Sequence, residues 1–233
     1  MTVDKKLGTI LEKHHQNTTK MDIQFDQVMP HPLASIQHGS DSIWGDSVML
    51  KAGHKILLNA SSGKGKSTFT MSVMGLRNDY NGTIRMDGRD IKQFSIDEWV
   101  AYRQNKLSVV FQDLQLFPNL SVAENLLSKN QLTEFKTENE IREFLDILEI
   151  GHKWNEPCRL LSMGQQQRVA IVRALCQPFE FLILDEPFSH LDDRNSKISL
   201  ELIAKEASKQ NAGFVLTSLD DDDKFPYDYE LKL

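Results

Sequence analysis

The sequence predicts an α/β fold with a central parallel sheet, and two stretches carry that prediction. Residues 56–58 form a short apolar run that precedes a loop of small residues and then a segment with helical apolar spacing. Residues 181–184 form a continuous apolar run, which is typical of a strand buried on both faces of a parallel sheet. Asp185 and Glu186 follow this run directly, and ligands bind at the carboxyl ends of the strands in such sheets.

The composition of the chain favours one large domain, or one domain with a subdomain, and excludes several classes of protein. The 233 residues are 40% hydrophobic and 26% charged, with a formal net charge of −6. An acidic protein is not expected to bind nucleic acid through a basic surface. Cys158 and Cys176 have no metal-ligand spacing and form no disulfide framework, which fits a reducing cytosol. No run approaches the roughly 18 apolar residues of a membrane span, so membrane association is expected only through a partner.

The first third of the chain reads as an extension followed by strands. Residues 1–20 hold a short amphipathic pattern and are expected to extend a domain that covers residues 21–233. Alternation from Ile23 to Val28 predicts a strand, and residues 47–50 predict a second one. The pair Asn81-Gly82 predicts a turn, followed by a hairpin strand at residues 83–86.

Residues 59–68, Asn-Ala-Ser-Ser-Gly-Lys-Gly-Lys-Ser-Thr, have the pattern of a phosphate-binding loop. Backbone N–H groups of such a loop surround phosphates, and the helix that follows directs its positive dipole end at them. We expect Lys66 to reach the β- and γ-phosphates of ATP and the Ser67 hydroxyl to bind Mg²⁺. The other residues expected to bind the nucleotide are Ala60, Ser61, Ser62, Gly63, Lys64, Gly65 and Thr68.

The loop departs from the motif at its first position, because Ala60 stands where the pattern has glycine. Alanine is acceptable there if its backbone keeps a negative φ. The alternative interpretation is an ordinary Ser/Gly/Lys turn. Four stretches further along the chain favour the phosphate-binding loop.

The middle of the chain begins with a strand at residues 107–111 that ends on Gln112. A mostly helical region follows, and its Glu138, Glu140 and Glu143 are expected to form a charged helix surface. Ser162 is the expected N-cap of a helix that runs through Leu175.

The strand at residues 181–184 ends on two acids with distinct expected roles. Asp185 is expected to orient Mg²⁺, and Glu186 to polarise an attacking water. The alternative, two solvated acids in a turn, leaves the phosphate loop without a metal partner. A helix at about 197–208, a strand at 214–218 and a last strand within 227–233 complete the pattern.

In their order and spacing, five stretches resemble an ABC-transporter ATPase subunit. They are the phosphate loop, Gln112, Leu-Ser-Met-Gly-Gln at 161–165, Leu-Asp-Glu-Pro at 184–187 and Ser-His-Leu-Asp at 189–192. The resemblance covers residues 21 to about 220. The stretches 110–112, 116–118, 124–125 and 164–170 most resemble the lipoprotein-release, macrolide-export and cell-division branch.

This resemblance implies a P-loop NTPase fold with a RecA-like core, an antiparallel β subdomain and an inserted helical subdomain near 113–175. It implies that two ATPase subunits, identical or different, pair head to tail around ATP. Ser162, Gly164 and Gln165 of one subunit would then bind the nucleotide held by the other, with the helix N-terminus facing the γ-phosphate. Gln112 would contact the metal and a groove for a permease's coupling helix. The chain would therefore work as an ATPase on the cytoplasmic face of the cell membrane, held there by an integral-membrane permease.

Two departures from the family pattern concern the γ-phosphate. We call residues 161–165 the signature, and Met163 replaces the first glycine that the family has there. Leu219 replaces the switch histidine, which donates a hydrogen bond that leucine cannot make. ATP binding is therefore a firmer expectation than fast hydrolysis. A second reading stays open, in which the chain is a binding module that dimerises on ATP and hydrolyses little.

Two further points remain open at the level of sequence. A P-loop kinase is a third reading, but it gives the stretch 162–165 no role. His31, His38 and, less well, Trp44 are the candidates to stack on adenine.

Overall fold

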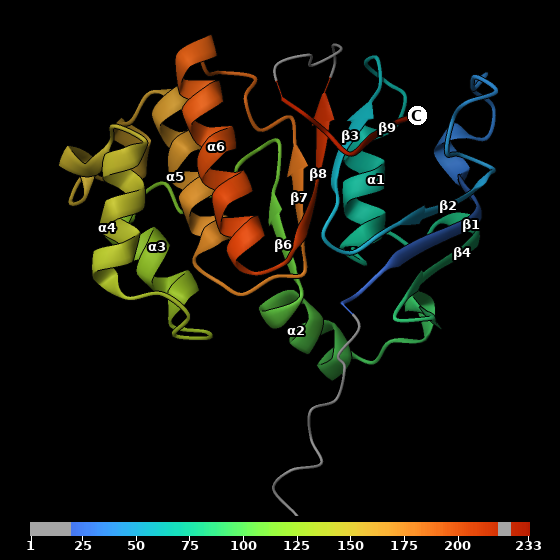
Figure 1. Cartoon of the computed structure of the whole chain (residues 1–233), viewed down its shortest axis with the longest axis horizontal. Coiled ribbons are helices and arrows are strands. Elements are labelled where there is room, and N and C mark those ends of the chain that lie inside the picture. Colours follow the sequence, from blue (N-terminus) through green and yellow to red (C-terminus); the bar gives the residue numbers. More distant parts are fainter. Residues whose placement is uncertain (1–19, 219–224) are drawn as a thin grey trace, which may run out of the picture.

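Two sheets organise the residues that the computed structural model describes, 20–218 and 225–233. The larger sheet is parallel and has the strand order β6 (Leu107–Val110), β7 (Phe181–Asp185), β8 (Gly213–Ser218), β3 (Lys55–Asn59) and β9 (Tyr229–Lys232). Figure 1 shows this sheet between α1 (Lys66–Val73) on one side and α5 (Met163–Leu175) and α6 (Asp193–Lys209) on the other. The predicted α/β fold is confirmed.

Alternate residues of the parallel strands belong to two separate hydrophobic cores, because successive side chains of a strand point to opposite faces of the sheet. Ile56 and Leu58 of β3 belong to the core beside α1, whereas Leu57 belongs to the core beside α5 and α6. All five residues of β7 are buried, as its continuous apolar run predicts.

The second sheet is antiparallel and has the order β2 (Ser47–Leu50), β1 (Ile23–Pro30), β4 (Tyr80–Met86) and β5 (Arg89–Asp90). It packs on α1, where the rings of Phe25 and Phe69 stack with centroids 5.4 Å apart. A short turn of 3-10 helix, η1 (His31–Leu33), follows β1 and leads toward the phosphate loop. The antiparallel sheet therefore supports the loop from the side opposite α5.

The predicted turn at Asn81-Gly82 is wrong, because both residues lie inside β4. The pairing of β1 with β4 shifts register between Asp26 and Met29, which marks a β-bulge. Gly82 has φ of +80°, and a Cβ there would lie 2.3 Å from the Gln27 carbonyl oxygen. Glycine at this position therefore serves a bulge across the sheet instead of a turn along the chain.

Helices fill the chain between β6 and β7. They are α3 (Val122–Asn130), α4 (Glu138–Ile147), the short η3 (Gly151–Lys153) and η4 (Cys158–Leu160), and α5. We call α3, α4, η3 and η4 the helical lobe; Figure 1 shows it beside α5 and α6, away from the antiparallel sheet. Outside it, η2 (Ile91–Gln93) and α2 (Ile96–Asn105) connect β5 to β6.

Local capping explains where several of these helices begin. Reciprocal side-chain caps open α2, α3, α4 and α5, and the last of these confirms Ser162 as an N-cap. The helix predicted from about Lys197 begins earlier, at Asp193, because the Asp192 carboxylate accepts a hydrogen bond from the Asn195 N–H. Among the described residues, no helix combines the length and the apolar character that crossing a bilayer requires.

Candidate nucleotide site

The phosphate loop connects β3 to α1 and depends on one glycine for its close packing. Gly65 has φ of +104°, and a Cβ there would lie 2.4 Å from Leu33 Cδ1 and 3.2 Å from Trp44 Nε1. Only glycine fits this conformation and this space without displacing a neighbour. Ala60, in contrast, is not among the described residues with positive φ. This is the condition under which alanine can replace the glycine of the motif.

Trp44 packs against the phosphate loop and holds its backbone. Its side chain is buried, and its indole Nε1–H donates to the Lys64 carbonyl oxygen at 3.0 Å. A buried ring in this position is not available to stack on adenine, so the structure does not support Trp44 in that role. His38 hydrogen-bonds the Leu33 carbonyl at 3.0 Å and His31 lies 3.4 Å from the Asn81 side chain.

A cavity of about 260 Å³ lies against the loop. Its lining joins four parts of the chain: Leu33; Ser62, Gly63, Gly65, Lys66, Ser67 and Thr68; Gln112; and Glu186. Sequence reasoning missed Leu33, because it stands with Ala34 and Ile36 in a short segment after two prolines and belongs to no motif. The structure thus brings the phosphate loop together with Gln112 and Glu186, as predicted.

Lys66 is held inside this cavity by oxygen atoms. Its side chain is only 6% exposed; Nζ donates to the Ala60 carbonyl at 2.8 Å and forms an ion pair with Glu186 Oε1 at 3.2 Å. The ammonium group is therefore already placed where a phosphate would meet it. A bound phosphate would compete with Glu186 for this cation.

The two acids at the end of β7 have different environments. Asp185 is buried, and the Thr217 hydroxyl donates to its Oδ1 at 3.0 Å. Burial raises the pKa of Asp185, against the opposing effect of hydrogen bonds from Thr217, Ser67 and Thr70. Glu186 has φ of +49°, a strained value for this residue type, and its N–H donates to the Thr217 hydroxyl oxygen at 3.1 Å.

Thr217 is thus a functional residue that sequence reasoning missed. It holds both acids, although it stands 31 and 32 positions away from them in the chain. The signal in the sequence was a polar residue within the apolar run of β8.

Gln112 joins the loop to the acids. Ser67 Oγ donates to Gln112 Oε1 at 3.3 Å, and Gln112 Nε2 donates to Glu186 Oε2 at 3.4 Å. The oxygens of Ser67, Gln112 and Asp185 form a hard donor set with a single carboxylate. That set fits Mg²⁺, which is usually bound by one or two carboxylates, water and substrate phosphates. No cluster of three His, Cys, Asp or Glu side chains that would suit a different metal occurs in the described part of the chain.

The residues of the signature lie elsewhere. Ser162 Oγ accepts from the Gln165 N–H at 3.3 Å, and Gln165 Oε1 accepts from the Ser162 N–H at 3.0 Å, so the two cap α5 together. Neither they nor Gly164 line the cavity at the phosphate loop. One chain therefore does not bring the two predicted halves of the nucleotide site together.

Gly164 is needed for packing inside the chain. A Cβ on Gly164 would lie 2.7 Å from the His190 carbonyl oxygen, so only glycine lets α5 approach the loop at 189–192 this closely. The neighbouring Met163 side chain is 47% exposed, on the outer surface of the same helix end.

Gln167 is another residue that sequence reasoning missed. It is buried on α5, its Nε2 donates to the Glu186 carbonyl at 3.1 Å, and its Oε1 accepts from the His190 N–H at 3.0 Å. Gln167 therefore fixes the backbone at both ends of the segment from Glu186 to His190. Its signal was a polar side chain on the same helix face as the buried Ala170, Ile171 and Ala174.

Comparison with known proteins agrees with this geometry. Residues 45–189 match the ABC transporter family. The chain belongs to this family. It is an ABC ATPase, and its fold is that of the P-loop NTPase cassettes.

Curated relatives and solved structures show which members of the family this ABC ATPase is similar to. It is 35% identical over 179 residues to a lipoprotein-releasing system ATP-binding protein LolD of Buchnera aphidicola, which covers 75% of this chain and 77% of that one. Identity to the LolD protein of Leptospira interrogans is 31% over 170 residues, 71% of each chain. A dimeric, post-hydrolysis structure of the ATP-binding cassette MJ0796 with ADP and Pi superposes with a TM-score of 0.71 at 25% identity, covering 85% of this chain and 88% of that one.

Several sequence predictions fall outside the described residues. They concern residues 1–19 and the missing switch histidine at Leu219. These predictions stay untested by the structure.

Proposed function

We propose that this ABC ATPase works as one of two ATPase subunits that drive an integral-membrane permease of the lipoprotein-release type. The observation that carries the proposal is the separation of Ser162–Gln165 from the phosphate-loop cavity within one chain. Head-to-tail pairing of two subunits supplies each loop with the signature of the other. The dimeric MJ0796 structure and the LolD relatives support this pairing and the branch.

The roles of the site residues follow from their positions. The phosphate loop, Ala60 to Thr68, binds the phosphates of ATP through its backbone N–H groups, and Lys66 binds the β- and γ-phosphates. Mg²⁺ bound through Ser67, Gln112 and Asp185 would neutralise charge on the phosphate oxygens. From the partner subunit, Ser162, Gly164 and Gln165 present a capped helix N-terminus to the γ-phosphate.

Glu186 is the proposed general base, which accepts a proton from the attacking water at its carboxylate. In the structure this carboxylate is paired with Lys66 and hydrogen-bonded by Gln112. Phosphates of ATP compete for Lys66, and their binding releases Glu186 to orient a water. Substrate binding and activation of the base are coupled in this way.

The proposed permease surface lies on the helical lobe. The backbones of residues 117–120 and 157–159 pair there, with the Cys158 N–H donating to the Leu120 carbonyl at 2.9 Å. Phe117 and Leu160 nearby are 54% and 60% exposed, high values for large apolar side chains. This surface is connected through residues 113–116 to Gln112 and so to the nucleotide site. We place the chain on the inner face of the cell membrane, bound there to its permease through this surface.

A second candidate function is an ATP-dependent dimerising module with little hydrolysis. The exposed Met163 at the signature favours it, since its side chain occupies the surface where a partner's phosphate would approach.

The test of the proposed function is nucleotide-dependent assembly. A Glu186→Gln variant, which lacks the base, is examined by multi-angle light scattering with and without Mg-ATP. We expect a monomer without nucleotide and a dimer with it, and a Ser162→Arg change in the same background should abolish the dimer. A monomer at high protein concentration under both conditions would contradict the homodimer and indicate a different ATPase subunit as partner.

A further inference from the structure

His190 lies next to the signature, and its backbone is fixed on both sides. Its N–H donates to Gln167 Oε1 at 3.0 Å, and its carbonyl packs against Gly164, where an added Cβ would approach it to 2.7 Å. The imidazole is exposed and does not line the cavity at the chain's own phosphate loop. His190 is therefore an exposed residue beside Gly164, next to the surface that the signature would offer to a partner subunit.

A chain of hydrogen bonds leads to this imidazole and accommodates its Nε2–H tautomer. The His190 N–H can only donate, so the Gln167 atom that it meets is the amide oxygen. The other amide atom of Gln167 is then the NH₂ group, which donates to the Glu186 carbonyl at 3.1 Å and to Ser189 Oγ at 3.3 Å. Ser189 Oγ can accept this bond and donate its own proton to the His190 Nδ1, 3.0 Å away, and this is the arrangement that we infer.

With Nδ1 accepting from Ser189, the proton of the neutral ring is on Nε2. Nε2 has no hydrogen-bond partner among the described residues. In this arrangement the network leaves one N–H donor without a contact in the described part of the chain. It is a donor without a structural role inside the subunit.

We propose that His190 Nε2–H donates a hydrogen bond to the γ-phosphate of the ATP bound at the partner subunit's phosphate loop. In this chain it takes the place of the switch histidine that the family has where Leu219 stands. This inference rests on the proposed head-to-tail dimer. A neutral donor at this position stabilises the negative charge that develops as the γ-phosphate is transferred, and it affects turnover more than binding.

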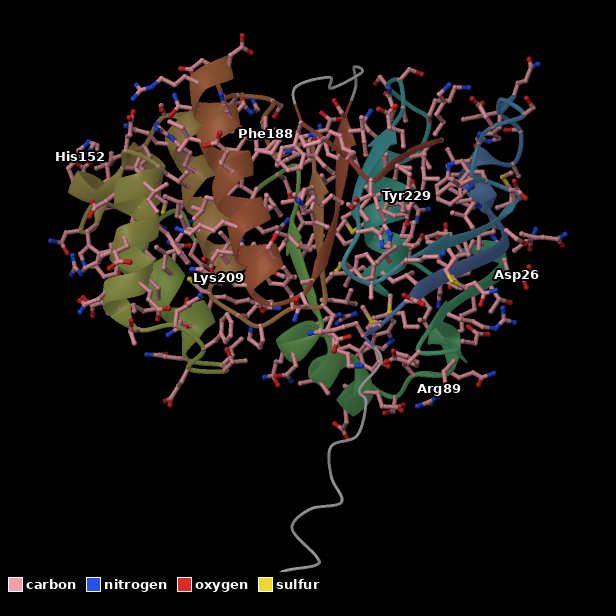
Figure 2. All side chains as sticks on the ribbon, viewed as in Figure 1. Asp26, Arg89, His152, Phe188, Lys209 and Tyr229 are labelled. Atoms are coloured by element: carbon pink, nitrogen blue, oxygen red, sulfur yellow. The ribbon has the colours of Figure 1, made fainter. Side chains whose placement is uncertain are left out.

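The kinetic test measures phosphate release by the full chain at saturating Mg-ATP. Removal of one such donor typically lowers turnover about 10²- to 10³-fold, so we expect His190→Ala to lower kcat at least about a hundredfold and to leave KM for ATP nearly unchanged. His190→Gln retains a side-chain N–H at similar reach and should keep most of the rate. His152→Ala is the matched control, because His152 is exposed at the outer end of the helical lobe (Figure 2).

Rescue distinguishes a donor from a packing role. Leu219→His added to His190→Ala returns a donor from the position that the family uses, and we expect it to restore most of the lost rate. A kcat of His190→Ala within about threefold of the wild type would overturn the proposal. A rescue that fails, with His190→Gln as slow as His190→Ala, would also overturn it, because packing would then explain the loss.

Assembly separates this inference from the proposed function. In the Glu186→Gln background, His190→Ala should still form the dimer with Mg-ATP, since it removes no fixed backbone contact. If Glu186→Gln itself stays monomeric, the proposed function fails and this inference with it. If the dimer forms and His190→Ala keeps its turnover, only the role of His190 is wrong.

A spectroscopic test examines the tautomer without any turnover. Long-range ¹H–¹⁵N spectra of histidine-labelled protein at about pH 8, where imidazole rings are neutral, report which nitrogen carries the proton. The signals absent from the His190→Gln variant belong to His190. We expect the Nε2–H tautomer in the wild type and a mixture in Ser189→Ala. An Nδ1–H tautomer in the wild type would contradict the hydrogen-bond chain on which the proposal rests.

Discussion

At the scale of single residues, Gly164 shows packing that opposes intrinsic helix propensity. Alanine is a better helix former than glycine by about 1 kcal/mol, so Gly164→Ala would stabilise an unconstrained α5. The added Cβ instead meets the His190 carbonyl oxygen at 2.7 Å, and the helix or the loop at 189–192 has to move. We expect a loss of about 1–3 kcal/mol in the free energy of unfolding, measured in urea, together with slower turnover.

The matched control for this substitution is Met163→Ala on the same helix end, where the side chain is exposed. Its stability should stay within about 0.5 kcal/mol of the wild type. A Gly164→Ala variant as stable as this control, or more stable, would show that the contact with His190 is not restrictive.

Lys66 supports a second prediction at this scale. The ammonium group is buried among oxygens and forms charge-assisted bonds, each of which typically contributes about 1.5–3 kcal/mol. Lys66→Ala should therefore weaken Mg-ATP binding at least about tenfold in isothermal titration calorimetry. The exposed Lys51 provides the control substitution. Equal affinity of wild type and Lys66→Ala would refute the phosphate-loop assignment.

At the scale of elements, a buried ion pair joins the helical lobe to α6. Lys136, just before α4, contacts Glu206 of α6 at 2.8 Å, and both side chains are buried; Lys209, also on α6 (Figure 2), binds the other oxygen of Glu206 at 2.6 Å. Breaking a buried pair from one side typically costs about 3–5 kcal/mol. Lys209 remains as a partner of Glu206 in the Lys136→Met variant. We therefore expect this variant to lose about 3 kcal/mol in the free energy of unfolding, measured in urea, which is the low end of that range.

The double variant Lys136→Met/Glu206→Leu removes both charges and should recover most of that loss. Arg194→Met is the control, since its pair with Glu149 is exposed and should contribute less than about 1 kcal/mol. A double variant as unstable as Lys136→Met alone would show that lost packing, not an unpaired charge, explains the effect.

The same pair predicts a pH dependence. Burial raises the pKa of Glu206, but hydrogen bonds from Lys136 and Lys209 outweigh it and hold the pKa below the ordinary 4.5. The folded state therefore binds this proton less tightly than the unfolded chain, so the pair stabilises the fold above about pH 4.5 and loses its effect as the pH falls through the lowered pKa. Between neutral and acid pH, wild-type stability should fall more than that of the double variant; parallel curves would exclude the pair as a source.

At the scale of the whole molecule, the proposed function assigns nucleotide-driven assembly and permease binding to different surfaces. Phe117 and Leu160 are exposed, and neither lines the cavity at the phosphate loop. Phe117→Ser/Leu160→Ser should therefore reduce co-purification with the permease and leave Mg-ATP-dependent dimerisation intact. Ile96→Ser, at an 82% exposed apolar residue of α2, is the control. Normal permease capture by the double variant, or its loss with Ile96→Ser, would place the permease surface elsewhere.

Features that depend on neighbouring residues could be predicted from the sequence. A strand, a small-residue loop and a helix in succession define the phosphate loop, Ser162 and Gln165 cap α5 across three positions, and the acids of β7 follow an apolar run directly. Residue types and short spacings are sufficient for each of these, since the interacting groups are neighbours in the chain.

Contacts between groups far apart in the chain became known from the folded structure alone. The sequence could not show that Trp44 lies beneath the loop, that Thr217 holds both acids, or that Gln167 connects Glu186 to His190. Asn81-Gly82 carries a turn signal that the pairing of β4 with β1 overrides. The separation of the signature from the phosphate loop within one chain was expected only from the family resemblance, because it depends on how the helices pack on the sheet. Hydrogen bonds and steric contacts between residues far apart in the chain exist only once the elements have packed, and here those contacts position the site.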